Sequence, residues 1–115
     1  MATRSIAYEK SLAFSKRIVH LYQYLRDQHR EYVMSKQILR SGTSIGANIA
    51  EARYGISRSD FLAKIYIALK ECAETIYWLE LLYSCSYLEE DAYRSMLADC
   101  EELRKMLSAT TKSTQ

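Results

Sequence analysis

The sequence predicts an all-α protein that folds as an up-down antiparallel four-helix bundle. Its 115 residues include no proline and only three glycines, too few for a sandwich or barrel with many tight turns. Four long segments instead repeat apolar residues at spacings of three and four, as amphipathic helices do. The joints between them are short, and short joints make neighbouring helices antiparallel. We expect a single domain over residues 1–107 and a flexible tail over residues 108–115.

The first helix is expected from Ser5 to Arg26. It carries two neighbouring apolar stripes, which together cover about half of its circumference. The first stripe contains Tyr8, Leu12, Ser15, Val19 and Tyr22. The second contains Phe14, Ile18, Leu21 and Leu25. This pattern is typical of a helix that faces the core. The joint that follows, over residues 27–32, has no glycine or proline to mark it.

The second helix is expected from Tyr32 to Tyr54. Its core face contains Ile38, Gly42, Ile45, Ile49 and Ala52. We expect Gly55 to end this helix in the left-handed conformation, with Ile56 packing back onto the last turn. Residues 57–60 then supply capping groups for the next helix.

Small and polar residues crowd the second helix. Gly42, Gly46 and Ala50 form a smooth strip that would let another helix approach closely and so offset the cost of two interior glycines. A polar seam runs beside the strip, through Arg40, Ser44, Asn48 and Glu51. We interpret this seam as a structural hydrogen-bonded network, with Glu74 as a candidate salt-bridge partner for Arg40.

The third helix, from Ser59 to Ser84, has the most regular pattern. Its core seam contains Leu62, Ile65, Leu69, Cys72, Ile76, Leu79 and Tyr83. A second apolar face lies opposite and contains Ile67, Trp78 and Leu81, flanked by Tyr77 and Leu82; Glu74 lies on the same face. Because a four-helix monomer buries one face of each helix, this second face predicts a homo-oligomer that packs through it. The alternative is that this helix is simply the central helix of an asymmetric bundle.

The fourth helix is expected after a joint over residues 85–88. Glu89, Glu90 and Asp91 place negative charge where a helix N-terminus favours it. Its core stripe contains Tyr93, Met96, Cys100, Leu103 and Leu107.

Residues 40–52 (RSGTSIGANIAEA) and 59–82 (SDFLAKIYIALKECAETIYWLELL) resemble the bacterial four-helix-bundle family of intervening-sequence or S23-type proteins. Some members are encoded by insertions within large-subunit ribosomal RNA genes. A related branch contains the accessory variability determinants of diversity-generating retroelements. The resemblance implies a homopentameric ring of bundles, and it suggests a nucleic acid or a protein such as a reverse transcriptase as the partner.

No catalytic constellation is recognisable. Neither His20 nor His29 has a carboxylate three residues before it, as a helical di-metal site would require. The sequence contains no glycine-rich phosphate loop. We interpret Cys72 and Cys100 as apolar core residues, and Cys85 as a thiol near a helix end that lacks a partner base. We therefore expect no enzymatic activity, no cofactor and no metal.

The dispersed cysteines, the absence of an apolar signal segment and the absence of a membrane-length apolar run indicate a cytoplasmic protein with reduced thiols and no membrane partner. The charge is unevenly divided. Residues 1–70 hold 12 Lys or Arg against five Asp or Glu, whereas residues 71–115 hold four against nine. Such an excess is typical of a polyanion-binding surface, of complementary surfaces within an assembly, or simply of solvated helix faces.

Two functions of different classes therefore remain open. The first is association with RNA or DNA, with aromatic stacking on Tyr24 or Tyr32. Its candidate phosphate-contacting residues are Lys10, Lys16, Arg17, Arg26, Arg30 and Lys36. The second is a scaffold or adaptor ring that recruits a protein partner and does not contact nucleic acid.

Overall fold

Four long helices and no strands make up residues 5–114, the part of the chain that the computed structural model describes. They are α1 (Ile6–His29), α2 (Met34–Ala52), α3 (Arg58–Ser84) and α4 (Glu90–Thr114). The predicted all-α class and the four predicted helices are thus confirmed. The first four residues and the last residue, which we assigned to the domain and to the tail, lie outside the described range.

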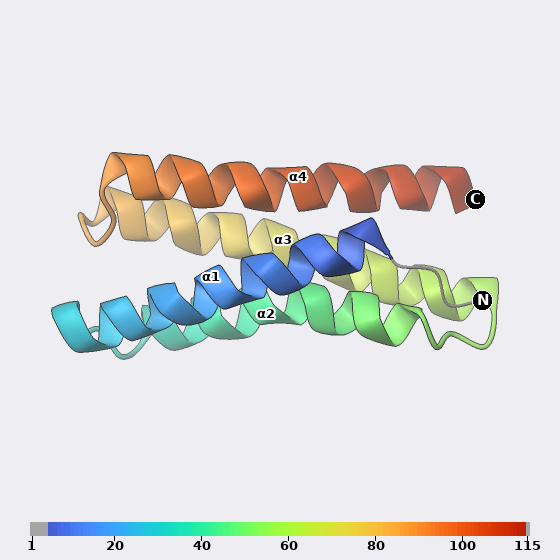
Figure 1. Cartoon of the computed structure of the whole chain (residues 1–115), viewed down its shortest axis with the longest axis horizontal. Helices are drawn as coiled ribbons and strands as arrows, with labels where there is room; N and C mark the ends of the chain where they lie inside the picture. The colour runs from blue at the N-terminus through green and yellow to red at the C-terminus, as the bar shows by residue number, and fades with distance from the viewer. Residues whose placement is uncertain (1–4, 115) are drawn as a thin grey trace.

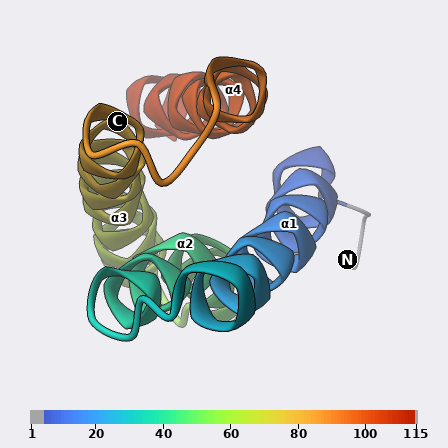
Figure 2. The ribbon, with the colours of Figure 1, turned by 90° about the vertical axis from the view of Figure 1, so that its left-hand side faces the viewer.

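The helices form a rod of 44 × 20 × 20 Å, along which the chain passes back and forth (Figure 1). Viewed from the end of the rod, α1 lies against α2, α2 against α3 and α3 against α4 (Figure 2). The packing between α1 and α4 is the least extensive of the four contacts. At the end where α1 finishes and α4 begins, these two helices stand apart (Figure 2).

The turn between α1 and α2 is built without glycine. Arg30 ends α1 in the left-handed conformation, at φ 52° and ψ 37°, and its backbone N–H donates to the Leu25 carbonyl. Glu31 then caps α2, because its carboxylate accepts hydrogen bonds from the backbone N–H groups of Met34 and Ser35 at 3.1 and 2.7 Å. Arginine is not a usual residue at a helix C-terminus of this kind, and glutamate is not a usual N-cap. The sequence therefore shows no clear boundary between the first two helices.

The turn between α2 and α3 corrects two expectations. No glycine in the described residues has a positive φ, so Gly55 does not end α2 in the left-handed conformation. Its role is close approach instead, because a Cβ at Gly55 would lie 3.0 Å from the Phe61 nitrogen. Ile56 does not pack back onto α2, since 95% of its surface is exposed. Ser57 caps α3 as predicted, accepting a hydrogen bond from the Asp60 N–H at 3.0 Å.

The last helix is longer than predicted. We placed the end of the domain at residue 107, but α4 continues through Thr114, and Thr111 is only 5% exposed. Thr111 bonds locally, because its hydroxyl donates to the Ser108 carbonyl at 2.7 Å. The Ser/Thr-rich composition suggested fraying, but local side-chain hydrogen bonds and core contact accommodate these residues in the helix.

The core fills the space between the four helices. Its largest fully buried side chains are Phe14, Ile18, Leu25, Ile38, Ile45, Leu79, Leu82, Leu103 and Leu107. The predicted core face of α2 is buried throughout. On α1 only the second stripe is buried, and on α3 the core also takes Ala68, Thr75 and Leu82, while Leu62 and Leu69 are only half-buried.

The small-residue strip of α2 does admit a neighbouring helix, and that helix is α1. A Cβ at Gly42 would lie 2.7 Å from the Ile18 side chain, and one at Gly46 would lie 3.0 Å from the Ser11 hydroxyl. The two glycines therefore set the close approach of α1 to α2.

Candidate functional site

Two of the six candidate phosphate-contacting residues form ion pairs with another helix. Lys10 pairs with Glu102 at 3.2 Å. Arg17 pairs with Asp99 at 2.6 Å and also donates to the Ser95 hydroxyl at 3.0 Å. These contacts join α1 to α4, so the positive charge of Lys10 and Arg17 is balanced by acidic residues that the sequence analysis did not pair with them.

Of the other four residues, Arg26 forms an ion pair within its own helix, and three form none with the described residues. Arg26 donates to the carboxylate of its neighbour Asp27, which lowers the pKa of that carboxyl group. Lys16, Arg30 and Lys36 are exposed, and none of them forms an ion pair with any residue from 5 to 114. The structure thus divides the six into three ion-paired residues, Lys10, Arg17 and Arg26, and three that form no ion pair with the described residues, Lys16, Arg30 and Lys36.

Two of the three unpaired candidates, Arg30 and Lys36, lie at or near the turn between α1 and α2. Arg26, Arg30 and Lys36 lie on either side of this turn, and Tyr32 within it is 52% exposed. Val33 beside it is 70% exposed. Cations next to an exposed aromatic ring are what single-stranded nucleic acid binding uses, for phosphates and bases respectively. Tyr24, the other stacking candidate, instead contacts His29 through its hydroxyl at 2.9 Å.

The second apolar face of α3 is partly exposed. Ile67 and Tyr77 are 39% and 55% exposed, while Trp78 and Leu81 are half-buried. Leu82, which we placed beside this face, lies fully in the core and does not belong to it. The indole ring of Trp78 packs edge-on against Tyr77, with 5.0 Å between ring centroids.

The polar seam of α2 leads onto this face. Arg40 donates to Glu74, the partner predicted from the sequence, and lies 3.4 Å from Glu71, which was not foreseen. The Trp78 Nε1–H also donates to Glu74 at 3.0 Å. The Arg40 guanidinium, followed by Trp78, holds the pKa of the Glu74 carboxyl below its usual value.

The rest of the seam is satisfied locally. Ser44 donates to the Arg40 carbonyl at 2.6 Å, and Asn48 donates to the Ser44 carbonyl at 2.9 Å. Glu51 pairs with Lys64 of α3 at 2.8 Å. Every hydrogen bond of the seam that we identify lies within α2 or reaches α3, which fits a structural network.

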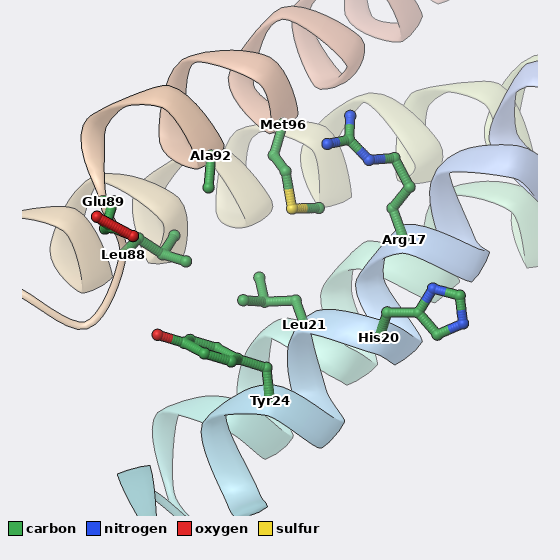
Figure 3. Close-up of a pocket in the computed structure, with 8 residues that line it drawn as sticks. All are labelled: Arg17, His20, Leu21, Tyr24, Leu88, Glu89, Ala92 and Met96. Carbon is green, nitrogen blue, oxygen red and sulfur yellow. The ribbon is translucent and has the colours of Figure 1, made fainter. Parts of the chain in front are cut away.

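A pocket of about 370 Å³ opens between α1 and α4 where the two helices stand apart (Figure 3). Leu21 reaches into it from α1, and Leu88 and Met96 reach into it from the other side (Figure 3). Arg17 and Tyr24 of α1 and Glu89 before α4 also line it. The pocket therefore has an apolar floor and a charged rim.

The described residues hold no group of three His, Cys, Asp or Glu side chains placed to bind a metal ion. Within the same range no helix is long and apolar enough to cross a membrane. Cys72 and Cys100 are buried and Cys85 is exposed. The contact with the Cys72 side chain, together with burial, raises the pKa of the Cys100 thiol.

The comparisons with known proteins agree on the family. The sequence model described as "23S rRNA-intervening sequence protein" matches residues 3–109. The chain is also similar to a solved crystal structure from Bacteroides thetaiotaomicron, a protein with unknown function from the S23 ribosomal protein family. The two share 52% sequence identity and a TM-score of 0.92, over 93% of this chain and 99% of that one. No curated protein matches.

Proposed function

Because the chain belongs to the 23S rRNA-intervening sequence protein family, we propose that it is a non-enzymatic, cytoplasmic accessory protein that associates with RNA. The site is the turn between α1 and α2, where Arg26 and Arg30 precede the exposed Tyr32 and Lys36 follows it. The cations contact phosphates, and the ring offers a stacking surface for a base. No base-reading motif is present, so binding depends on charge more than on sequence.

The observation that carries this proposal is the conformation of Arg30. A left-handed backbone costs a residue other than glycine about 1–2 kcal/mol, and glycine is the usual choice at this position of a helix end. Arg30 nevertheless occupies it at φ 52° and forms no ion pair with the described residues. An unpaired cation held in an unfavourable conformation indicates that its side chain acts on something outside the chain.

We also propose that the up-down bundle is the subunit of a homo-oligomeric ring, packed through Ile67, Glu74, Tyr77, Trp78 and Leu81 of α3. The partial exposure of Ile67 and Tyr77 supports this interface, because contiguous exposed apolar side chains mark protein contacts. The number of five subunits comes from the family resemblance. A ring would repeat the basic turn around its axis and so multiply the phosphate contacts.

RNA binding is tested by fluorescence anisotropy with a labelled single-stranded RNA over a series of salt concentrations. We expect Arg30→Gly and Lys36→Gln each to weaken binding and to lower the slope of log K against log salt by about 0.7. Arg30→Gly should not lower the free energy of unfolding, since glycine relieves the left-handed strain. Its effect on binding therefore cannot come from unfolding.

The matched control is Lys105→Gln, which removes one exposed positive charge from α4. It should leave the slope unchanged. Absence of RNA retention at low salt, or an equal loss in the control, would contradict the site.

The ring is tested by light scattering. Ile67→Asp and Tyr77→Glu should convert an assembly into monomers of 13.4 kDa, because each places a charge in a buried apolar contact. The control Ile6→Asp changes an isoleucine that is 65% exposed on α1 and should leave the assembly intact. A wild-type protein that is monomeric at micromolar concentration would contradict the proposed ring.

A protein scaffold is the second candidate. The pairing of Lys10 and Arg17 with Glu102 and Asp99 favours it, since it removes two cations from any RNA surface. If the ring forms but retains no RNA, and one protein partner is recovered after nuclease treatment, the scaffold replaces the RNA function.

A further inference from the structure

The pocket between α1 and α4 has the size and lining of a site for a small chemical group. Its volume of about 370 Å³ lies within the range of pockets that enclose small ligands. Leu21, Leu88 and Met96 form its apolar floor, and Glu89 stands on its rim (Figure 3). Such a lining suits a ligand that has apolar faces and a polar edge.

This pocket adjoins the basic turn between α1 and α2, and both lie at the end of the rod where α1 finishes (Figure 1). The ring of His29 lies 5.3 Å from the ring of Tyr87, which belongs to the joint between α3 and α4. Arg30 directly follows His29, while Leu88 and Glu89 of the pocket directly follow Tyr87. A chain molecule that contacts the unpaired Arg30 therefore passes beside the pocket.

Tyr24 supplies an aromatic side to the pocket, and its ring extends along the opening (Figure 3). The tyrosine is 42% exposed, so part of its ring is available to a ligand. Its hydroxyl contacts His29 Nε2 at 2.9 Å, and the two rings pack edge-on with 5.0 Å between their centroids. These contacts hold the ring in place, which lowers the entropy lost when a planar group packs against it.

The free polar group of the pocket is the carboxylate of Glu89. It is exposed, and its side chain forms no hydrogen bond or ion pair with the described residues. The two other polar side chains on the rim differ from it, since Arg17 is paired with Asp99 and the His20 ring points away from the floor (Figure 3). An ionised carboxylate only accepts hydrogen bonds, so the pocket suits a group that donates N–H.

We propose that this pocket takes up one unstacked base of the RNA whose phosphates contact Arg30 and Lys36. This inference rests on the RNA binding proposed above and adds the place where a base is held. The faces of the base pack on the apolar floor and against Tyr24, and the N–H groups at its edge donate to Glu89.

Among the bases, guanine matches this acceptor best. Its N1–H and its amino group are neighbouring donors, which suit the two oxygens of one carboxylate. Uracil offers a single N–H between two carbonyl oxygens, and these oxygens would face the negative charge of Glu89. The pocket should therefore favour guanine over uracil at one position of the RNA.

The charges at this end of the rod divide the work between base and phosphate. Glu89 and the exposed Asp91 form no ion pair with the described residues, so they repel a phosphate from the pocket itself. Arg30 and Lys36 attract phosphates to the neighbouring turn. A base has no charge to be repelled, and its covalent link to those phosphates brings it to the pocket.

The test is fluorescence anisotropy of the full chain with two labelled RNAs, a uridine oligomer and the same oligomer with one central guanosine. We expect the wild type to bind the guanosine oligomer about fivefold more tightly, as one pair of hydrogen bonds to a base edge provides. Free guanosine at the concentration of the oligomer should not displace it, because guanosine lacks the phosphate contacts. Displacement would assign the pocket to a free nucleoside and overturn the proposal.

Two variants locate the base. Ala92 is exposed on α4 and its side chain points into the pocket (Figure 3), so Ala92→Phe should fill the opening and remove the preference for guanosine. Glu89→Gln should also remove it. The ratio of the two affinities is the readout, since loss of a negative charge strengthens the binding of both oligomers. The matched control Ala98→Phe, exposed on α4 outside the pocket lining, should keep the preference.

The outcomes separate this inference from the proposed function. Equal affinities of the wild type for the two oligomers, with salt-dependent binding retained, would overturn the pocket and leave the RNA function standing. A preference that survives Ala92→Phe, or that Ala98→Phe removes equally, would place the base elsewhere and also overturn it. Absence of binding by either oligomer at low salt would contradict the RNA function and this inference together.

Discussion

Glu31 performs at the start of α2 the capping that serine or aspartate usually performs. Its carboxylate accepts hydrogen bonds from the backbone N–H groups of Val33, Met34 and Ser35. Partial burial tends to raise the pKa of this carboxyl group, but the three N–H groups outweigh burial and lower it below its usual value of 4.5. The ionised form therefore stabilises the fold.

We expect Glu31→Gln to lower the free energy of unfolding by about 1 kcal/mol at pH 7. A group whose folded pKa is lowered contributes stability above its unfolded pKa and loses it as the pH falls through the folded pKa. The difference between variant and wild type should therefore be full above pH 4.5 and shrink in stronger acid. Urea unfolding at pH 7 and below pH 4 measures it.

The control for this prediction is Glu80→Gln, which alters an exposed carboxylate of α3. It should change stability little at either pH. A Glu31→Gln effect that stays the same in acid would show that the charge is not what caps the helix.

Gly42 is a second position where one residue decides the packing. Alanine would gain about 1 kcal/mol of helix propensity over glycine, but its Cβ would lie 2.7 Å from the fully buried Ile18. We expect Gly42→Ala to be destabilising by about 1–2 kcal/mol, because overpacking outweighs propensity. A Cβ at Gly46 would meet the Ser11 hydroxyl first, at 3.0 Å, so Gly46→Ala should be clearly milder. Equal effects in urea unfolding would contradict this reason for the glycine.

At the scale of elements, α1 carries two apolar stripes with the same sequence spacing that differ in burial. Leu25 belongs to the stripe that lies in the core and is fully buried, while Leu12 belongs to the other stripe and is 46% exposed. Both stripes have the same spacing in the sequence. The stripe that faces both α2 and α4 becomes the core.

We expect Leu25→Ala to lower the free energy of unfolding by about 2–5 kcal/mol, as a buried leucine does. Leu12→Ala is chemically the same change on the same helix and should cost less than about 1 kcal/mol. Thermal or urea unfolding of the two variants measures the difference. Similar losses would mean that the first stripe is also covered, by a neighbouring copy.

The sequence predicted the helices well and their ends poorly, for physical reasons. Periodicity and capping signals are local, so the core face of α2 and the cap at Ser57 could be identified. The turn at Arg30 and Glu31 uses residues that rarely take those roles. The role of Gly55 depends on a close backbone approach to Phe61. Local sequence patterns do not reveal such a contact.

The candidate site was predictable only in part. Charge counts identified Lys10 and Arg17, but their partners Glu102 and Asp99 lie on α4, far along the chain. Which cations remain free depends on tertiary contacts. The prominence of Ile56 was missed because we assigned it to a local helix-end motif.

For the molecule as a whole, the four helix contacts are unequal. α2 and α3 pack most extensively, and a buried hydrogen bond of 3.0 Å joins Thr75 to Ser41 between them. α1 and α4 touch least, and exposed ion pairs join them, which contribute about 0–1 kcal/mol each. The rod therefore has a closely packed central pair, α2 and α3. The helices α1 and α4 pack on either side of this pair and contact each other least.

This arrangement predicts an order of local opening. We expect backbone amides of α2 and α3 around Ser41 and Thr75 to exchange hydrogen most slowly, and those of α1 and α4 sooner. Hydrogen exchange read by mass spectrometry measures this. The Tyr77→Glu variant removes any contribution from the proposed α3 interface. Slowest exchange in α1 or α4 would contradict the unequal packing.

Trp78 is the only tryptophan in the chain, and it lies half-buried on the outer face of α3 with its Nε1–H bound to Glu74. The ultraviolet emission of the unlabelled protein therefore comes chiefly from one known place. If neighbouring subunits cover that indole, its emission maximum moves to shorter wavelength as concentration rises. A dilution series in a fluorimeter can thus follow assembly without any dye or engineered label.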